Sequence, residues 1–374
     1  MSTLRLAALI VVAALATPVF AQAPAQAPGP VEQEVRSRLE AMRAVRPTDS
    51  AEAVGKQMDD IWKYFDANRA KALPILRAAI LAEEHRPDKS PFMLLGTGFY
   101  LYTHGDKIDR EPAKVALFAV DSSSPIIRAN LEQYFYFVHA VAIEHDERVL
   151  PLIDAVFLDK KLPLVIPEFA LNLDESLVCV MLYGAYGEGA EAHLQPFLQN
   201  PARSQKVIEI LIWIGSPASN TAVLGAIRAN RNLDTFARGT AFLMQAGGPE
   251  GKSIMQKINP ADLDPASAEA LNKSHQHIDV VSGAWYKSIF DRMGGAATIP
   301  DADIRRRLAA TAAGKGRDES LSPRAIYASG IPRDELILLL TATRIAMLQH
   351  VYDQVLQDVR TTDMVINALR LRDH

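Results

Sequence analysis

Cysteine is nearly absent from this sequence, since Cys179 is the only one in 374 residues. An intramolecular disulfide is therefore excluded, and the fold must be stabilised by packing. The neighbours of Cys179 between Leu177 and Leu182 are all apolar. We therefore expect a buried thiol that takes no part in catalysis.

A long hydrophobic run is missing after residue 21, where no segment approaches the ~20 apolar residues of a membrane-spanning helix. Within the first 21 residues, Arg5 precedes a short apolar run from Leu6 to Ala16, and Val19-Phe20-Ala21 suits cleavage by signal peptidase. This pattern predicts a signal peptide over residues 1–21, cleaved near Ala21, and a mature chain that is periplasmic or secreted. Residues 22–30, rich in proline and alanine, predict a disordered tether.

An excess of basic charge is missing too, because the formal net charge is −4 and charged residues make up 22% of the chain. No long basic stripe is present, which argues against nucleic acid as a partner. The cluster Arg305-Arg306-Arg307 closely follows Asp301 and Asp303. We interpret it as the solvated face of a helix.

The residue patterns of common catalytic and metal sites are also absent. There is no Gly-x-Ser-x-Gly or Ser-x-x-Lys motif, and no two histidines lie three or four residues apart, the spacing that presents two zinc ligands on one helix. The histidines are His85, His104, His139, His145, His193, His275, His277, His350 and His374. Glu144-His145-Asp146-Glu147 is the strongest metal candidate, but we interpret it as a solvated turn between helices. We therefore name no catalytic, cofactor-binding or metal-ligating residue and expect no cofactor, although distant residues can still assemble a catalytic site.

Residues Ala246 to Ser253 fit a relaxed form of the phosphate-binding loop. Such a loop holds phosphates with backbone amides, a lysine and a serine, between a buried strand and a helix. Here Pro249 removes one amide, and the preceding residues from Thr240 to Gln245 predict the end of a helix. We therefore expect a glycine-capped helix end followed by a proline-started helix.

The sequence does contain many signals for the starts of helices. From Val31 onward, a capping residue directly precedes a proline seven times, which is typical of helix starts because proline has no amide to leave unpaired. The pairs are Ser90-Pro91, Ser124-Pro125, Asn200-Pro201, Ser216-Pro217, Asn259-Pro260, Asp264-Pro265 and Ser322-Pro323. The β-branched run from Val207 to Ile214 would suit a buried strand on its own, but helical patterns on both sides favour a helix.

Apolar residues recur at helical spacing in two further segments. After Pro125 they predict one continuous, largely buried helix through Ile127, Leu131, Phe135, Val138 and Ala142. Near the C-terminus they predict the longest helix of the chain, running from about Asp334 through Leu340, Met347, Leu348, Val351, Val355 and Val359.

One pattern repeats about every 30 residues, in which a turn residue is followed by apolar residues at plus seven and plus eleven. It starts at Gly187, Ser216 and Gly247, with looser echoes after Asn68 and His145. Over residues 174–258 the chain resembles HEAT-like α-helical repeats. The resemblance implies stacked helical hairpins in a solenoid, with an extended surface for a macromolecular partner.

We therefore predict an all-α fold with a helical-repeat domain over residues 31–258. Residues 259–374 are expected to form a less regular helical cap packed on it, because Gly294-Gly295 and Gly314-Lys315-Gly316 interrupt the helical pattern.

Aromatic residues are the remaining lead toward a site. Phe99, Tyr100 and Tyr102 fall near one predicted helix, and residues 134–137 on another, where they suit either a core or a ligand groove. We predict an exported, noncatalytic repeat protein that binds a protein or peptide partner. The alternative is a periplasmic hydrolase or small-ligand-binding protein whose site lies between the helices of residues 90–143 and those after residue 300.

Overall fold

The computed structural model describes residues 29–46, 48–160, 164–166, 171–173, 175–200, 202–214, 217–229, 256, 258–278, 282–315, 318, 320–350 and 354–372. These residues are overwhelmingly helical, which confirms the all-α prediction. The first part of the chain forms α1 (Pro30–Arg43), α2 (Ala51–Ala67), α3 (Arg69–Glu84), α4 (Pro91–His104), η1 (Lys107–Asp109), α5 (Arg110–Phe118), α6 (Pro125–Ala129), α7 (Leu131–Ile143), α8 (Val149–Ile153) and the π-helix η2 (Asp154–Leu158).

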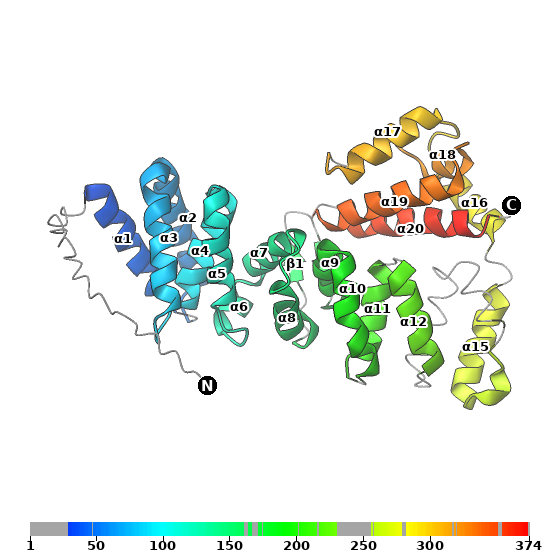
Figure 1. Cartoon of the computed structure of the whole chain (residues 1–374), viewed down its shortest axis with the longest axis horizontal. Helices are drawn as coiled ribbons and strands as arrows, with labels where there is room; N and C mark the ends of the chain where they lie inside the picture. Colours follow the sequence, from blue (N-terminus) through cyan, green and yellow to red (C-terminus); the bar gives the residue numbers. More distant parts are fainter. Residues whose placement is uncertain are drawn as a thin grey trace, which may run out of the picture.

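The second part forms α9 (Glu175–Tyr186), α10 (Glu188–Leu194), η4 (Gln195–Gln199), α11 (Ser204–Ile214), α12 (Pro217–Ala229), η5 (Pro260–Asp262), α15 (Pro265–Ile278), α16 (Gly283–Met293), α17 (Asp301–Ala312), α18 (Pro323–Ala328), α19 (Arg333–Leu348) and α20 (Val355–Arg370). Together the helices make an elongated array that runs from α1 at one end to α15 at the other (Figure 1). The last helices turn back, so that α19 packs against α9. None of the described helices is long and apolar enough to cross a membrane.

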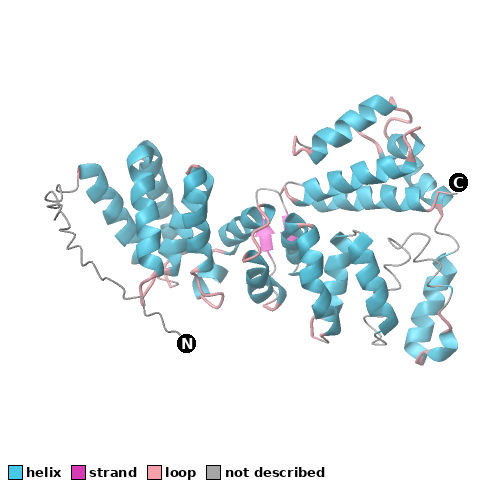
Figure 2. Ribbon diagram, in the orientation of Figure 1, coloured by secondary structure: helices cyan, strands magenta, loops and turns pink. Residues whose placement is uncertain are grey.

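A short β ladder in the middle of the array was not predicted. β1 (Leu164–Ile166) pairs antiparallel with β2 (Leu171–Leu173), with Val165 opposite Asn172. The two strands lie beside α7 and α9 (Figure 2). Strands of three residues are too short to show the alternation by which a strand is recognised in a sequence.

The helix starts follow the capping pairs closely. The proline is the first residue of its helix in α4, α6, α12, η5, α15 and α18. Ser90 and Ser322 cap α4 and α18 by accepting a backbone N–H at 3.3 and 3.1 Å. The exception is Asn200, whose Oδ1 accepts from the Ala202 N–H in a local turn, so that α11 begins only at Ser204. α11 includes Val207 to Ile214, which confirms a helix there.

Both predicted continuous helices are broken, and the prediction was wrong on this point. Asn130 leaves helical geometry at φ −128° and ψ 40° and separates α6 from α7, while its side-chain amide donates to the Ile126 carbonyl at 3.0 Å. The C-terminal helix ends at Leu348, and Gln354, with φ 63°, precedes a second helix. Because α20 then folds back on α19, each helix buries its apolar face against the other.

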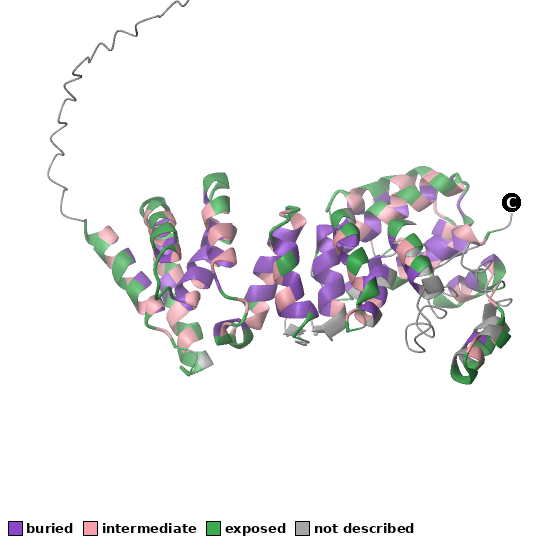
Figure 3. Ribbon diagram, turned by 60° about the horizontal axis from the view of Figure 1, so that its bottom comes forward, coloured by how far each residue is buried: buried purple, intermediate pink, exposed green. Residues whose placement is uncertain are grey.

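The buried apolar residues fall into two clusters. The larger one extends from α1 to α12 and also takes in Leu271 of α15, the end of α19 and the start of α20. The smaller one joins α16 to α20. Buried residues are densest in the middle of the array (Figure 3). The C-terminal helices therefore have a core of their own and also complete the core of the preceding helices.

A buried arginine joins these two parts. Arg344 of α19, 2% exposed, pairs with Asp363 of α20 and donates to the carbonyl of Ile214, the last residue of α11. Nearby, Gly184 of α9 allows close approach, because a Cβ there would lie 2.8 Å from Leu348 Cδ1. Burial raises the pKa of Asp363, and the opposing effect of Arg344 is smaller.

We expect Arg344→Ala to destabilise the protein by about 3 kcal/mol, because Asp363 loses its ion-pair partner and the Ile214 carbonyl loses a donor. Urea unfolding followed by circular dichroism measures this loss. The exposed Arg306→Ala on α17 is the control and should unfold like wild type. Equal midpoints for the two variants would contradict the role assigned to Arg344.

A second prediction concerns His139 of α7, 5% exposed, whose ring N–H donates to the Leu348 carbonyl at 3.2 Å. Burial lowers the pKa of His139 to about 4, below the value of about 6.5 expected in the unfolded chain. The unfolded chain then binds more protons, so stability should fall by about 3 kcal/mol as the pH drops from about 6.5 to 4. Urea unfolding at several pH values measures the slope, which His139→Gln should flatten. An unchanged slope in that variant would assign the acid sensitivity to other groups.

Candidate functional site

An aromatic cavity of 610 Å³ lies in the first part of the array. Its walls come from the segment after α1 and from α2, α4, α6 and α7, which are far apart in the sequence, from Val45 to Phe137, but meet around one space. The aromatic residues that line it are Trp62, Phe92, Phe99, Tyr134, Tyr136 and Phe137.

Three of these rings form a continuous wall. The Trp62 and Phe99 ring centroids are 6.0 Å apart, and the Phe99 and Phe137 centroids are 5.8 Å apart in an edge-to-face arrangement. Phe137 is buried, whereas Trp62 and Phe99 are only partly buried. Aromatic side chains with one packed edge and one free face are typical anchors for a ligand.

Two polar groups of the lining residues are left unsatisfied. The indole N–H of Trp62 and the hydroxyl of Tyr134 are buried and have no hydrogen-bond partner among the described residues. Burial raises the pKa of Tyr134, so its hydroxyl stays protonated at neutral pH. A buried donor without an acceptor costs about 1–3 kcal/mol. Neither atom has accessible surface, so an occupant of the cavity can pair with them only if the lining side chains shift.

The charges around the cavity are unequal. The carboxylates of Asp49, Asp59 and Glu132 line it, against the single guanidinium of Arg46. The Asp49 carboxylate also accepts the Arg46 backbone N–H at 2.8 Å, which closes the turn between α1 and α2. The space is thus apolar inside and mainly acidic at its charged positions.

Two local features of the sequence shape this cavity. Gly96 lets α4 approach α1 closely, since a Cβ there would lie 2.6 Å from the Met42 Cε. The break at Asn130 separates α6 from α7, so that Ile126, Ala129 and the first turn of α7 line the same space.

The predicted aromatic groups divide between cavity and core. Phe99, Tyr134, Tyr136 and Phe137 line the cavity, whereas Tyr100, Tyr102 and Phe135 do not. Tyr100 donates to Asp66 at 2.8 Å, and Phe135 is fully buried. Sequence reasoning missed the contribution of α2, above all Trp62 and Met58, although the tryptophan in an amphipathic helix was a visible signal.

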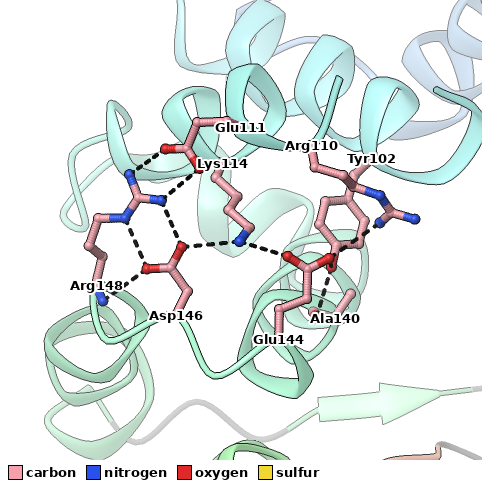
Figure 4. A network of polar contacts seen from close by, with 8 residues as sticks. All are labelled: Tyr102, Arg110, Glu111, Lys114, Ala140, Glu144, Asp146 and Arg148. Atoms are coloured by element: carbon pink, nitrogen blue, oxygen red, sulfur yellow. Dashed lines mark hydrogen bonds and ion pairs between the residues drawn. The ribbon is translucent and has the colours of Figure 1, made fainter. Parts of the chain in front are cut away.

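The turn Glu144–Glu147, considered above as a metal candidate, joins α7 to α8 and carries a network of ion pairs (Figure 4). Lys114 Nζ lies 2.6 Å from Glu144 and 3.2 Å from Asp146. Arg148 contacts Asp146 at 2.7 Å and Glu111 at 2.8 Å. The carboxylates of Glu144 and Asp146 are therefore neutralised by cations of the protein.

The ion-pair network also lowers the pKa values of two of its carboxyl groups. The hydrogen bond from Arg148 lowers the pKa of Asp146, against the effect of burial, and Lys114 adds to the shift. Burial alone would raise the pKa of Glu144, but hydrogen bonds from Lys114 and from the Tyr102 hydroxyl, 2.7 Å away, outweigh it and lower that pKa. Both groups are thus held as carboxylates by structural partners.

The histidines are dispersed. His145, at φ 56°, contacts the Tyr186 carbonyl at 2.6 Å, and His104 stacks on Tyr100 with ring centroids 4.7 Å apart. Sequence reasoning named His193 but did not foresee its contact with Asp154 of η2 at 2.9 Å, where the hydroxyl of Tyr183 donates to the same carboxylate. Tyr183 is fully buried, so this cluster joins η2, α9 and α10 inside the core.

The remaining candidates are placed as follows. In the part of the chain that the structure describes, no three His, Cys, Asp or Glu side chains come together to hold a metal. Cys179 is fully buried, as predicted. Arg305, Arg306 and Arg307 each pair with a carboxylate. The phosphate-loop candidate Ala246–Ser253 and the signal peptide lie outside the described residues, as do the side chains of His275 and His277 in α15.

We expect Lys114→Met to destabilise the protein by about 2 kcal/mol at pH 7, because Glu144 and Asp146 lose the ammonium that lies between them and keep only the more exposed Arg110 and Arg148. The loss should shrink at pH 5, since the pKa of one carboxyl rises once the ammonium is gone and a proton replaces it. Urea unfolding at both pH values tests this. Lys273→Met, which removes an exposed pair with Glu269, is the control and should unfold like wild type at both. A loss for Lys114→Met that does not depend on pH would contradict the explanation.

Comparison with known proteins adds no functional assignment. No family model, no curated protein and no solved structure matches this chain. The roles of Trp62, Phe99 and the other cavity residues therefore rest on their contacts and burial in this molecule.

Proposed function

We propose that this chain is an exported, noncatalytic helical-repeat protein that binds a protein or peptide partner in its aromatic cavity. Export rests on the signal-peptide pattern of residues 1–21. The binding role rests on the cavity between α2, α4, α6 and α7.

Support for a HEAT-like solenoid comes from the turns of the repeated pattern. Asn68, His145 and Gly187 each lie between two consecutive helices, and Gly187 has a φ of 82°. Of the residues that follow at plus seven and plus eleven, Leu194, Leu198, Val156 and Val223 are buried. We propose that these helix pairs stack as repeats and that the partner binds along the array.

The observation that carries the binding role is the partly exposed aromatic surface of Trp62 and Phe99 on the cavity wall. An extended peptide can place an apolar side chain against these two rings. The Trp62 N–H and the Tyr134 hydroxyl are buried behind that surface, so the backbone carbonyls of the peptide reach them only when the lining side chains shift. A peptide therefore matches the apolar wall first and the two donors after such a shift.

The volume of the cavity also favours a second candidate, a small-ligand-binding protein, because sites for small molecules measure about 300–1,000 Å³. The predicted alternative placed such a site between residues 90–143 and the helices after residue 300. None of the described residues that line this cavity comes from after residue 137. The lining includes no serine, cysteine or histidine among the described residues, so it offers no Ser–His or Cys–His pair for nucleophilic catalysis.

Gly55 offers a way to block the cavity without disturbing the fold. It lies on α2 and lines the cavity, and a Cβ built on it meets no atom within 4 Å. Gly55→Phe should therefore occupy this space, while Gly55→Ala leaves it open and should strengthen α2 by about 0.5–1 kcal/mol.

The test is selection of random 12-residue displayed peptides on the purified, immobilised chain. We expect peptides with aromatic or large aliphatic residues to be enriched on wild type and on Gly55→Ala, and to lose at least tenfold in affinity on Gly55→Phe. Circular dichroism checks that all three proteins are folded. Equal enrichment on Gly55→Ala and Gly55→Phe, or none on either, would reject peptide binding in this cavity and leave the small-ligand candidate.

A further inference from the structure

The charges around the cavity allow the class of partner to be narrowed. We infer that the partner segment is basic, an inference that rests on the proposed function. The segment places an apolar side chain in the cavity and a lysine or arginine beside it. The occupant is thus a cationic peptide rather than a neutral or acidic one.

The first support is the set of carboxylates. Asp59 of α2 is exposed, and no described residue forms a hydrogen bond or ion pair with it. Asp49 and Glu132 approach the same space from the segment after α1 and from α7. Carboxylates that converge from three separate segments on one apolar opening attract a positive group held next to an apolar anchor.

The second support is the aromatic wall. The faces of tryptophan, tyrosine and phenylalanine rings carry partial negative charge and attract ammonium and guanidinium groups within about 6 Å. Trp62 and Phe99 are partly buried, and Trp62 lies on the same face of α2 as Asp59, three residues further along the helix. The protein uses this contact elsewhere, where the Arg110 guanidinium lies 4.1 Å from the Tyr102 ring centre and that of Arg38 lies 4.3 Å from Tyr64.

Two positive features oppose this attraction. The Arg46 guanidinium lines the cavity, and the first turn of α7 presents backbone amides that together carry about half a positive charge. Three carboxylates exceed both features together, so the net charge around the cavity stays negative. The positive features instead suit the backbone carbonyls of the same peptide.

The experiment uses the peptides enriched in the selection described above. Their content of lysine plus arginine over aspartate plus glutamate should exceed that of the unselected library. A fluorescein-labelled representative is then titrated by anisotropy against the full chain, beside a copy with serine in place of each basic residue. The basic peptide should bind about tenfold tighter at 50 mM salt, and most of this advantage should disappear at 500 mM.

Matched variants assign the effect to the cavity. Asp59→Asn should weaken the basic peptide about threefold and leave the serine copy unchanged, while the triple variant Asp49→Asn, Asp59→Asn, Glu132→Gln should weaken it about tenfold. Asp60→Asn removes the same charge one residue further along α2, outside the cavity, and should bind like wild type. Enrichment of neutral or acidic peptides, or equal effects of Asp59→Asn and Asp60→Asn, would overturn the basic partner and leave peptide binding intact. Loss of enrichment altogether would reject the proposed function itself.

Discussion

The arrangement of this protein depends on one buried arginine. Arg344 reaches from α19 to Asp363 on α20 and to the carbonyl that ends α11, which lies 130 residues earlier in the chain. A buried guanidinium is costly unless most of its donors are paired, so the three helices must keep their relative positions. The contact of His139 with the Leu348 carbonyl and the close approach of Leu348 to Gly184 continue the same interface.

The cavity lies outside the interface of Arg344, in the first part of the array. The C-terminal helices complete the core against α7, α9 and α11, whereas α2, α4 and α6 meet around a space that none of the described C-terminal residues lines. The same stretch of aromatic residues serves both purposes. Phe135 faces the core, while Tyr136 and Phe137 reach the cavity, because neighbouring residues of a helix point in different directions.

Much of the fold was predictable from local chemistry. Capping residues before prolines mark helix starts, and the alanine-rich surroundings of Val207–Ile214 outweigh its β-branched composition. The breaks at Asn130 and between Leu348 and Val355 were not predictable, because apolar residues continue at helical spacing across both. Only packing against distant helices shows that two shorter helices bury more apolar surface than one long helix. The cavity was predictable in part. The aromatic residues of α4 and α7 were recognised from the sequence, but the contribution of α2 to the lining was not.

The sequence by itself determined that the chain is helical, that its stability needs no disulfide and that its lone thiol is buried, since composition and local propensity act within a few residues. The tertiary structure decided which aromatic residues form a cavity and which carboxylates surround it. It also decided which other carboxylates are neutralised by Lys114 and Arg148. Those outcomes depend on contacts between segments far apart in the chain. Their free energy comes from burial and charge pairing that exist only once the helices have packed.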